Sequence, residues 1–220
     1  MARIVFDLDG TLIDSVPDIH GIANEVLLQE GCEPLSLEQT REFIGNGAPT
    51  FIKRMRAARG IDDSEQARLL ADFVSRYEGA VTLTQPYPGV MGALNDLKAK
   101  GHSLGVCTNK PIRPCRAVLA HLKMDHFFDA ILGGDSLPVH KPDPAPLHAA
   151  FEMLGEGPRI YVGDSDVDAE TGQRAEVPFM LFTEGYRKCP IEDMPHSVAF
   201  DDFANFVGLV ERLLPVEASA

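Results

Sequence analysis

The pattern of apolar and polar residues changes character along the chain. An apolar run, Ile4-Val5-Phe6, lies within a stretch from residue 3 to 8 that predicts a buried strand. From residue 36 to about 84, apolar positions recur at helical spacing and no strand-like run interrupts them. After residue 84, short apolar runs alternate with helical patterns. Such alternation predicts a parallel sheet that is covered by helices on both faces.

The individual elements follow from the same periodicity. A polar bend over 14–18 precedes a helical pattern from Ile19 to Leu27, and 84–89 is interpreted as a linker. Further strands are predicted over 102–107, 128–132, 160–162 and 179–182. Further helices are predicted from 36, over 48–58, from 63 or 64 to 77, and over 90–100, 113–122, 145–154, 169–175 and 203–214. The last residues, 215–220, are expected to form a frayed tail.

The position of the all-helical stretch predicts the domain organisation. It begins after the first strand and ends before the other strands, so it is most simply an insertion into an α/β domain. We expect a Rossmann-like, doubly wound parallel sheet with an inserted all-helical cap over the carboxyl edge of the sheet. The core comprises residues 1–15 and 84–220, and the cap, as the inserted segment is called below, comprises residues 16–83.

Composition narrows the classes of function. The formal net charge of −13 argues against nucleic-acid binding, which depends on Lys and Arg at phosphates. No apolar run reaches the roughly 18 residues of a membrane span, and the first residues lack a secretory pattern. The cysteines are far apart and typical of reduced thiols in a cytoplasmic protein. They are Cys32, Cys107, Cys115 and Cys189.

Polar residues follow four of the predicted strands. The first strand ends in Asp7-Leu8-Asp9-Gly10-Thr11, although strands disfavour Asp and two neighbouring carboxylates repel. The others lead into Thr108-Asn109-Lys110, into His140-Lys141-Pro142-Asp143, and into Gly163-Asp164-Ser165-Asp166-Val167-Asp168. Ligands of open α/β sheets bind beyond the carboxyl ends of the strands. The joint occurrence of these four segments therefore indicates an active site.

Each segment also has a plain structural interpretation. Asp9-Gly10 is a common turn, and Lys141-Pro142 is compatible with a surface turn. Thr108-Asn109 would suit a turn or a helix N-cap. The acidic segment from residue 164 to 168 would suit a helix start, where negative charge is favourable. Only the order of the four segments, each behind an apolar strand, favours catalysis.

These segments resemble the four motifs of the haloacid dehalogenase superfamily. The motifs are DxDGT, a hydrophobic strand that ends in Ser or Thr, a Lys before a helix, and GDxxxD. This chain supplies them as Asp7 to Thr11, Thr108, Lys141, and Gly163 to Asp168. The resemblance spans nearly the whole chain, and the helical insertion is similar to the C1-type cap of that superfamily.

The resemblance implies a magnesium site. A cluster of carboxylates needs compensation, and an all-oxygen set of ligands suits Mg²⁺. By resemblance, Asp7, the backbone carbonyl of Asp9, and Asp164 would bind the metal. Asp168 would lie at or just beyond the metal ligands. No pattern of His and Cys residues suggests zinc.

The resemblance also implies catalytic roles. Asp7 would attack phosphorus as a nucleophile and form an aspartyl-phosphate. Asp9 would act as general acid and base, because a bend at Gly10 brings it over the substrate, with Thr11 completing the motif. The phosphoryl oxygens would be bound by Thr108, the Asn109 backbone amide and Lys141.

Two further features indicate the branch of the superfamily. Dehalogenase branches lack the Asp that stands here as Asp9, phosphonate hydrolases replace it, and hexose-phosphate mutases usually carry Val or Ile in place of Thr11. Phe43-Ile44-Gly45-Asn46-Gly47-Ala48-Pro49 resembles the phosphoglycolate phosphatase branch. Gly45, Asn46 and Gly47 would approach a small substrate, or would form a plain helix–helix turn. Arg41 could meet a substrate carboxylate, although an exposed helix arginine is the simpler interpretation.

We therefore expect a Mg²⁺-dependent phosphatase for a small phosphorylated metabolite, with 2-phosphoglycolate as the favoured substrate. The enzyme alternatives are a phosphatase for another small phosphate or pyrophosphate, and a phosphomutase similar to β-phosphoglucomutase. A catalytically idle binding protein would have lost one of the motif residues. The sequence leaves open whether the protein is a monomer or a homodimer.

Overall fold

The sheet expected from the sequence is present in the computed structural model, which describes residues 1–214. Six parallel strands lie in the order β5-β4-β1-β6-β7-β8. They are β1 (Arg3–Phe6), β4 (Ser103–Cys107), β5 (Ala130–Leu132), β6 (Arg159–Gly163), β7 (Phe179–Phe182) and β8 (Val198–Phe200). The doubly wound α/β architecture is thus confirmed. Strand β8 was not predicted, because it has three residues and its middle one, Ala199, is exposed.

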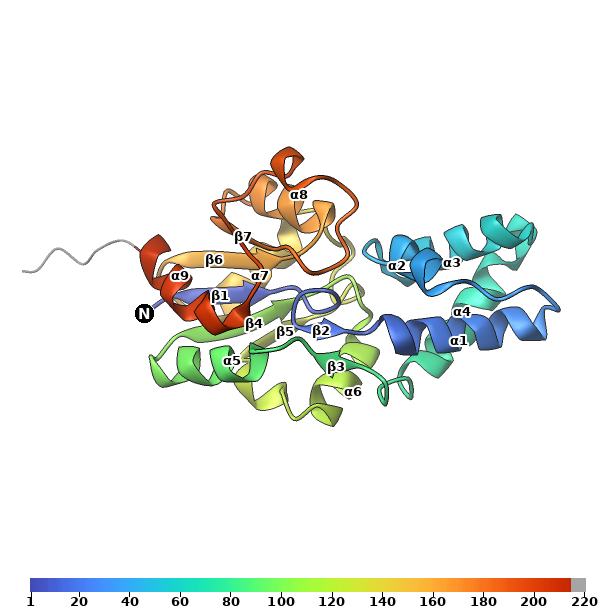
Figure 1. Ribbon diagram of the computed structural model, residues 1–220, viewed down its shortest axis with the longest axis horizontal. Helices are drawn as coiled ribbons and strands as arrows, with labels where there is room; N and C mark the ends of the chain where they lie inside the picture. Colours follow the sequence, from blue (N-terminus) through green and yellow to red (C-terminus); the bar gives the residue numbers. More distant parts are fainter. Residues whose placement is uncertain (215–220) are drawn as a thin grey trace, which may run out of the picture.

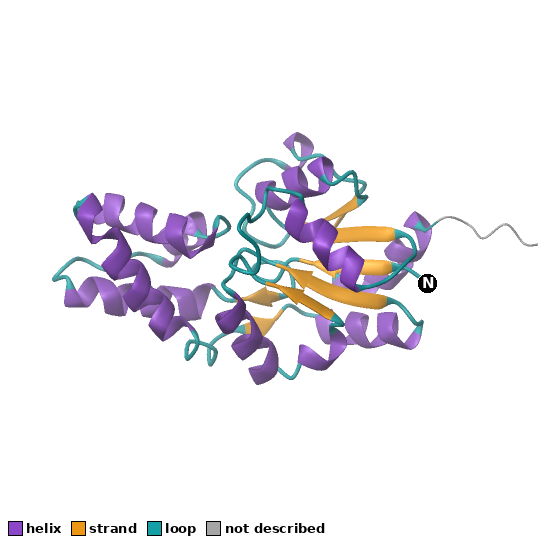
Figure 2. Ribbon diagram, turned by 180° about the vertical axis from the view of Figure 1, so that it is seen from behind, coloured by secondary structure: helices purple, strands orange, loops and turns teal. Residues whose placement is uncertain are grey.

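Alternate strand residues enter two apolar layers. Ile4 and Phe6 of β1 face a layer that includes α5 (Val90–Ala99), α6 (Ile112–His121) and α9 (Phe206–Leu213). Val5, between them, faces the opposite layer with α7 (Ala145–Met153) and α8 (Asp166–Arg174). Figure 2 shows these helices packed around the sheet. Because both faces are buried, the strands have continuous apolar runs.

Strand β1 is central and lies between β4 and β6. Phe6 is level with Val106 of β4 and with Val162 of β6. The chain therefore leaves all three strands at the same edge of the sheet. The crossovers run in opposite directions on the two sides of β1, and such a switch point is where ligands bind in open α/β sheets.

The inserted segment folds into four helices at the carboxyl end of the strands (Figure 1). They are α1 (Val16–Gln29), α2 (Leu37–Phe43), α3 (Gly47–Arg59) and α4 (Gln66–Tyr77). Their buried faces form an apolar cluster, in which the rings of Phe51 and Phe73 stack at 5.2 Å. We propose the division into residues 1–15 with 84–220 and residues 16–83, because all members of this cluster except Tyr186 belong to the inserted segment.

The connections between core and cap differ from the expected bend and linker. Two short strands, β2 (Ile13–Asp14) and β3 (Gln85–Pro86), pair antiparallel. Two-residue strands leave no alternation to recognise in a sequence. Helix α1 begins at Val16 and not after residue 18, because Pro17 falls in its first turn, where a missing N–H costs nothing.

Other boundaries shift for local reasons. Helix α8 begins at Asp166, three residues before the prediction, because Ser165 and Asp168 form a capping box. The predicted final helix divides into a 3₁₀ turn, Phe203–Asn205, and α9. The other 3₁₀ turns are Asp63–Glu65, Asp125–Phe127 and Ile191–Asp193. The predicted tail, 215–220, lies outside the described residues.

Two features of the composition can be compared with the structure. All four cysteines carry free thiols, and Cys107 and Cys115 are buried. Within residues 1–214, no helix has the length and apolar character that a membrane span requires.

Candidate active site

Three buried carboxylates meet at the carboxyl edge of the sheet. Asp7 follows β1, Asp164 follows β6, and Asp168 lies in the first turn of α8. One oxygen from each lies within 4.8 Å of the others. Buried carboxylates repel at this distance unless a positive charge compensates them.

Lys141 supplies one such charge. Its Nζ lies 2.8 Å from Asp7 Oδ1 and 2.7 Å from Asp168 Oδ1, and the side chain is 2% exposed. Burial opposes its charge, but Asp168 and Asp7 together keep the pKa of Lys141 above its usual value. One ammonium cannot neutralise three carboxylates, so the cluster remains short of positive charge.

Both carboxylate oxygens of Asp168 have hydrogen-bond partners within the protein. Besides Lys141, its Oδ1 accepts a hydrogen bond from the Tyr161 hydroxyl at 2.5 Å. Its Oδ2 accepts from Ser165 Oγ at 2.6 Å. Burial alone would raise the pKa of Asp168, but the neighbouring Lys141 and these donors hold it below its usual value. Asp168 is therefore an ionised carboxylate that fixes Lys141 in place.

Asp164 is held by groups from two other segments. Thr11 Oγ1 donates to its Oδ1 at 2.7 Å, and the Tyr186 N–H donates to its Oδ2 at 2.6 Å. Gly10 passes so close that a Cβ there would lie 2.5 Å from Asp164 Oδ2. Burial, followed by Asp168 and Asp7, raises the pKa of Asp164 well above its usual value.

Asp7 is the least satisfied member of the cluster. Burial is the main cause that raises its pKa, to about 7, and Lys141 only partly offsets it. Within the described residues, its Oδ1 lies beside Lys141 without a well-formed hydrogen bond. A buried oxygen without a hydrogen bond beside two further carboxylates is the environment that a hard cation relieves. The residues present therefore fit a divalent metal ion.

Asp9 has different surroundings, although it is only two residues away. Gly10, with φ +91°, turns the chain after it. Asp9 Oδ1 accepts from Ser15 Oγ at 2.6 Å and from Lys110 Nζ at 3.1 Å. Lys110 also donates to the Tyr77 hydroxyl of the cap at 2.7 Å. Asp9 thus lies apart from the carboxylate cluster, at the contact between core and cap.

Thr108 and Asn109 follow β4, as expected, and face the same space. The Asn109 Nδ2 donates to the backbone oxygens of Lys141, at 3.0 Å, and of Gly45, at 3.1 Å. Its Oδ1 is buried without a hydrogen bond to any described residue. Thr108 Oγ1 accepts from the backbone N–H of Lys110 at 3.2 Å. Asn109 therefore links the phosphate-site candidates to the cap.

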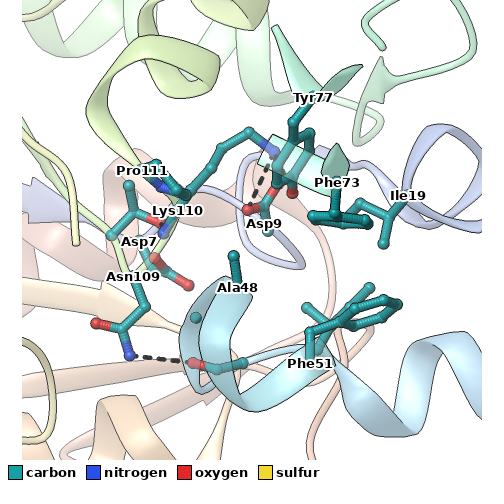
Figure 3. A pocket seen from close by; sticks show the side chains of 14 residues that line it. Asp7, Asp9, Ile19, Ala48, Phe51, Phe73, Tyr77, Asn109, Lys110 and Pro111 are labelled. Atoms are coloured by element: carbon teal, nitrogen blue, oxygen red, sulfur yellow. Dashed lines mark hydrogen bonds and ion pairs between the residues drawn. The ribbon is translucent and has the colours of Figure 1, made fainter. Parts of the chain in front are cut away.

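A small cavity of about 40 Å³ lies between the carboxyl edge of the sheet and the cap (Figure 3). This is room for about three water molecules. Asp7, Asp9 and Thr108 face it from the core. The remaining described lining residues are Asn109, Lys110 and Pro111 from the core, and Ile19, Ile44, Gly45, Gly47, Ala48, Phe51, Phe73 and Tyr77 from the cap.

The cap loop contributes through its backbone. Gly45 and Gly47 line the cavity, with φ of +113° and +81°. Among the described residues that line the cavity, Asn46 is absent, and its Oδ1 accepts a hydrogen bond from Arg54. Lys188, from the loop after β7, donates to the Ile44 oxygen at 2.7 Å. Side chains of the core therefore hold this loop through the backbone carbonyl groups of Ile44 and Gly45.

Sequence reasoning missed Lys110, Tyr77 and Ser15 as site residues. Lys110 stands directly after two predicted site residues, but a lysine at a strand end usually points into solvent. Tyr77 has no sequence signal, because its contact with Lys110 forms only when the cap lies on the core. Ser15 has none either, because its contact with Asp9 depends on the turn at Gly10.

The comparisons with known proteins agree with this geometry. Residues 4–182 match the family described as haloacid dehalogenase-like hydrolase. The chain belongs to this family. Among haloacid dehalogenase-like hydrolases, the phosphoglycolate phosphatase of Cereibacter sphaeroides (strain ATCC 17029) is 48% identical over 217 residues, which are 97% of this chain and 100% of that protein. The phosphoglycolate phosphatase of Rhodobacter capsulatus is 43% identical over 210 residues, 94% of this chain and 96% of that protein.

Solved structures give the same result. The crystal structure of a predicted phosphoglycolate phosphatase from Haemophilus somnus superposes with a TM-score of 0.87 at 32% identity. The match covers 94% of this chain and 97% of that chain. The resemblance to the haloacid dehalogenase superfamily is thus confirmed, and the chain is a hydrolase.

Proposed function

We propose that the protein hydrolyses 2-phosphoglycolate to glycolate and phosphate, with Mg²⁺ as the metal ion. The main support is that Asp7, which has an oxygen without a hydrogen bond, lines the same small cavity as Asp9. One carboxylate is available for attack and the other for proton transfer. The near full-length relatives that are named phosphoglycolate phosphatases support the choice of substrate.

In the first step, a carboxylate oxygen of Asp7 attacks phosphorus. The bond between phosphorus and the ester oxygen breaks, and its electron pair stays on that oxygen. Asp9 gives its proton to the same oxygen, so that glycolate leaves as an alcohol. The product on the protein is a phosphoryl group on Asp7.

In the second step, water attacks the phosphorus on Asp7. Asp9, now a carboxylate, takes the proton of that water, and the bond to Asp7 breaks. Inorganic phosphate leaves and both carboxylates return to their starting states. Ser15 and Lys110 position Asp9 for both transfers, apart from the carboxylate cluster.

The remaining residues bind and orient. Asp7, Asp164 and the backbone carbonyl of Asp9 would hold Mg²⁺, which supplies positive charge against the phosphoryl oxygens. Asp168 would orient Lys141 from outside the metal ligands. Thr108, the Asn109 N–H and Lys141 would donate to the phosphoryl oxygens. Gly10 and Thr11 position Asp164 by close approach and by a hydrogen bond.

The size of the cavity favours a small leaving group. With the cap in this position, the space of about 40 Å³ leaves less room for a sugar than for a two-carbon group. This argues for the phosphatase over a hexose-phosphate mutase. The loop with Gly45 and Gly47 lies at the side of the cavity away from the sheet, where it would limit the length of the leaving group.

A panel of small phosphomonoesters tests the proposal. We expect the highest kcat/KM for 2-phosphoglycolate, and loss of turnover in EDTA that is reversed by Mg²⁺. Pyrophosphate and glucose 1-phosphate serve as the alternatives. Turnover that requires a bisphosphorylated activator and releases little phosphate would establish a mutase instead. Equal rates for all small esters would contradict the assignment of 2-phosphoglycolate.

A further inference from the structure

Lys110 is the one basic side chain among the described residues that line the cavity. Its Nζ lies 3.1 Å from Asp9 Oδ1 and donates to the Tyr77 hydroxyl at 2.7 Å. The side chain is 3% exposed, so solvent contributes almost nothing to its hydrogen bonding. The Nζ also lies 4.0 Å from the centre of the Tyr77 ring. Figure 3 shows the three side chains converging at one side of the cavity.

This group has donors left for a ligand. An ammonium carries three N–H donors and a tyrosine one O–H donor. Asp9 and Tyr77 each take one N–H of Lys110, and the 3.4 Å contact with the second Asp9 oxygen is longer than an ordinary hydrogen bond. Across residues 1–214, the Tyr77 hydroxyl accepts from Lys110 and donates to no acceptor. The Tyr77 hydroxyl proton thus has no acceptor among these residues, and one N–H of Lys110 makes only a long contact, so both can donate to an acceptor from outside the chain.

The position of these donors relative to the chemistry identifies that acceptor. In the proposed function, Asp9 protonates the ester oxygen of the substrate. Lys110 contacts Asp9 and lines the same cavity, so it lies close to the group that would protonate that oxygen. In 2-phosphoglycolate a single methylene separates the ester oxygen from the carboxylate. A carboxylate brought into this buried space needs a positive charge beside it, and Lys110 lines the cavity there.

We propose that Lys110 and Tyr77 bind the carboxylate of the leaving group, and that they make the enzyme selective for phosphate esters with an anion one methylene from the ester oxygen. This inference rests on the proposed function. Lys110 comes from the core and Tyr77 from the cap, so the carboxylate site is complete only when the cap lies on the core. The carboxylate would accept one hydrogen bond from each, and both bonds are buried.

The other basic side chains near the site have different surroundings. Lys141 is engaged with Asp7 and Asp168. Arg41, the candidate from the sequence, is exposed and lies over the Tyr186 ring at 5.8 Å. Lys188 donates to the Ile44 oxygen. Neither Arg41 nor Lys188 is among the described residues that line the cavity.

The test compares two substrates that differ in the carboxylate alone. The wild-type protein and the variants Lys110→Met and Tyr77→Phe are assayed with 2-phosphoglycolate and with ethyl phosphate. The measured quantity is the ratio of the two kcat/KM values. Any effect of a variant through Asp9 changes both substrates alike and cancels in the ratio. We expect the ratio to fall about 100-fold in Lys110→Met and about 10-fold in Tyr77→Phe, because charged hydrogen bonds are lost.

A matched control comes from the cap. Lys53 of α3 is exposed and does not line the cavity, so Lys53→Met removes a cap cation without changing the ratio. A ratio that stays at its wild-type value in Lys110→Met, with both substrates slowed equally, would overturn the inference and assign Lys110 to positioning Asp9. The proposed function fails differently: the wild-type protein itself would show no preference for 2-phosphoglycolate over ethyl phosphate.

Discussion

Two carboxylates separated by one residue, Asp7 and Asp9, have sharply different environments. Asp7 is buried beside Lys141 and two further carboxylates, and burial raises its pKa to about 7. Asp9 lies at the edge of the cavity, with Ser15 and Lys110 as hydrogen-bond donors. The turn at Gly10 separates the two side chains. The different environments support a nucleophile and a proton carrier in one short segment.

The role of Asp9 predicts a partial loss of activity. Asp9→Asn keeps the shape of the side chain but removes proton transfer, so kcat should fall about 10²–10⁴-fold. Stopped-flow or steady-state phosphate release measures this loss. The loss should be smaller for a substrate whose leaving group needs no proton, such as 4-nitrophenyl phosphate. Equal losses for both substrates would contradict a general-acid role.

The raised pKa of Asp7 predicts pH-dependent metal binding. In the metal-free protein Asp7 keeps its proton below about pH 7, whereas an ordinary carboxyl loses it near 3.8. A metal ion binds the ionised form, so Mg²⁺ binding should release more protons at pH 6 than at pH 8. Calorimetry in two buffers with different ionisation enthalpies measures the release. Equal release at both pH values would contradict the raised pKa.

The raised pKa of Asp7 also makes the free energy of unfolding depend on pH. Between about pH 4 and pH 7 the unfolded chain has lost the Asp7 proton and the folded chain still holds it. The metal-free protein should therefore lose stability as pH rises through this window. Mg²⁺ should reverse the effect, because it binds the folded, ionised site.

At the residue scale, the sequence was informative where chemistry follows an apolar run. Asp7, Thr108 and Asp164 stand directly after strands, and parallel strands bring their carboxyl ends together. The partners of these residues were not predictable in the same way. The Tyr161 hydroxyl meets Asp168 across the turn from β6 to α8, and the Tyr186 N–H meets Asp164 from a later loop; neither contact has a signal in the sequence.

At the scale of elements, one carboxylate joins the two connections between core and cap. Asp18, in the first turn of α1, accepts hydrogen bonds from the backbone N–H groups of Leu83 and Thr84. It also accepts from Thr84 Oγ1 at 2.6 Å. The entry and exit of the cap are thereby tied together beside the β2–β3 pair. These contacts fix the base of the cap.

This tie predicts a loss of stability. Asp18→Ala leaves the buried N–H of Thr84 and the partly buried N–H of Leu83 without their acceptor, so the free energy of unfolding should fall by about 2–4 kcal/mol. Urea unfolding measures the change. Asp96→Ala, on the exposed side of α5, is the matched control and should change it by less than about 0.5 kcal/mol. Equal changes in both variants would show that the contacts of Asp18 do not contribute to stability.

The elements that sequence reasoning missed share one property: they are very short. β2 and β3 have two residues each, and β8 has three. Periodicity needs several residues to show, so longer strands and helices were predictable and these were not. The early start of α1 at Val16 was missed because Pro17 was interpreted as part of a bend.

At the scale of the whole molecule, the cap lies on the core through several contacts around the cavity. Asn109 donates to the Gly45 oxygen, Lys188 to the Ile44 oxygen, and Lys110 to Tyr77. With the cap in this position, the space between cap and core measures about 40 Å³. We infer that the cap opens about the β2–β3 connections and closes over the substrate, which excludes water from the reacting phosphorus.

The contact of the cap loop with the core predicts a further effect. Gly47 has φ +81°, and a Cβ there would lie 3.3 Å from the backbone oxygen of Asn109. Gly47→Ala should therefore strain the loop, disturb closure and lower kcat/KM about 10-fold. Gly21→Ala, with open space around its Cβ in α1, is the control. It should leave kcat/KM unchanged, and unchanged activity in Gly47→Ala would contradict the role of the loop in closure.

In the proposed reaction the phosphoryl group is transferred to Asp7 before it reaches water. The direct measurement is rapid acid quench of the protein with ³²P-labelled 2-phosphoglycolate and Mg²⁺, followed by mass spectrometry of the phosphorylated peptide. We predict label on Asp7 within the first turnover, no label on Asp7→Asn, and no phosphate release by that variant while its fold is retained. Normal phosphate release by Asp7→Asn, or label on another residue, would contradict the account.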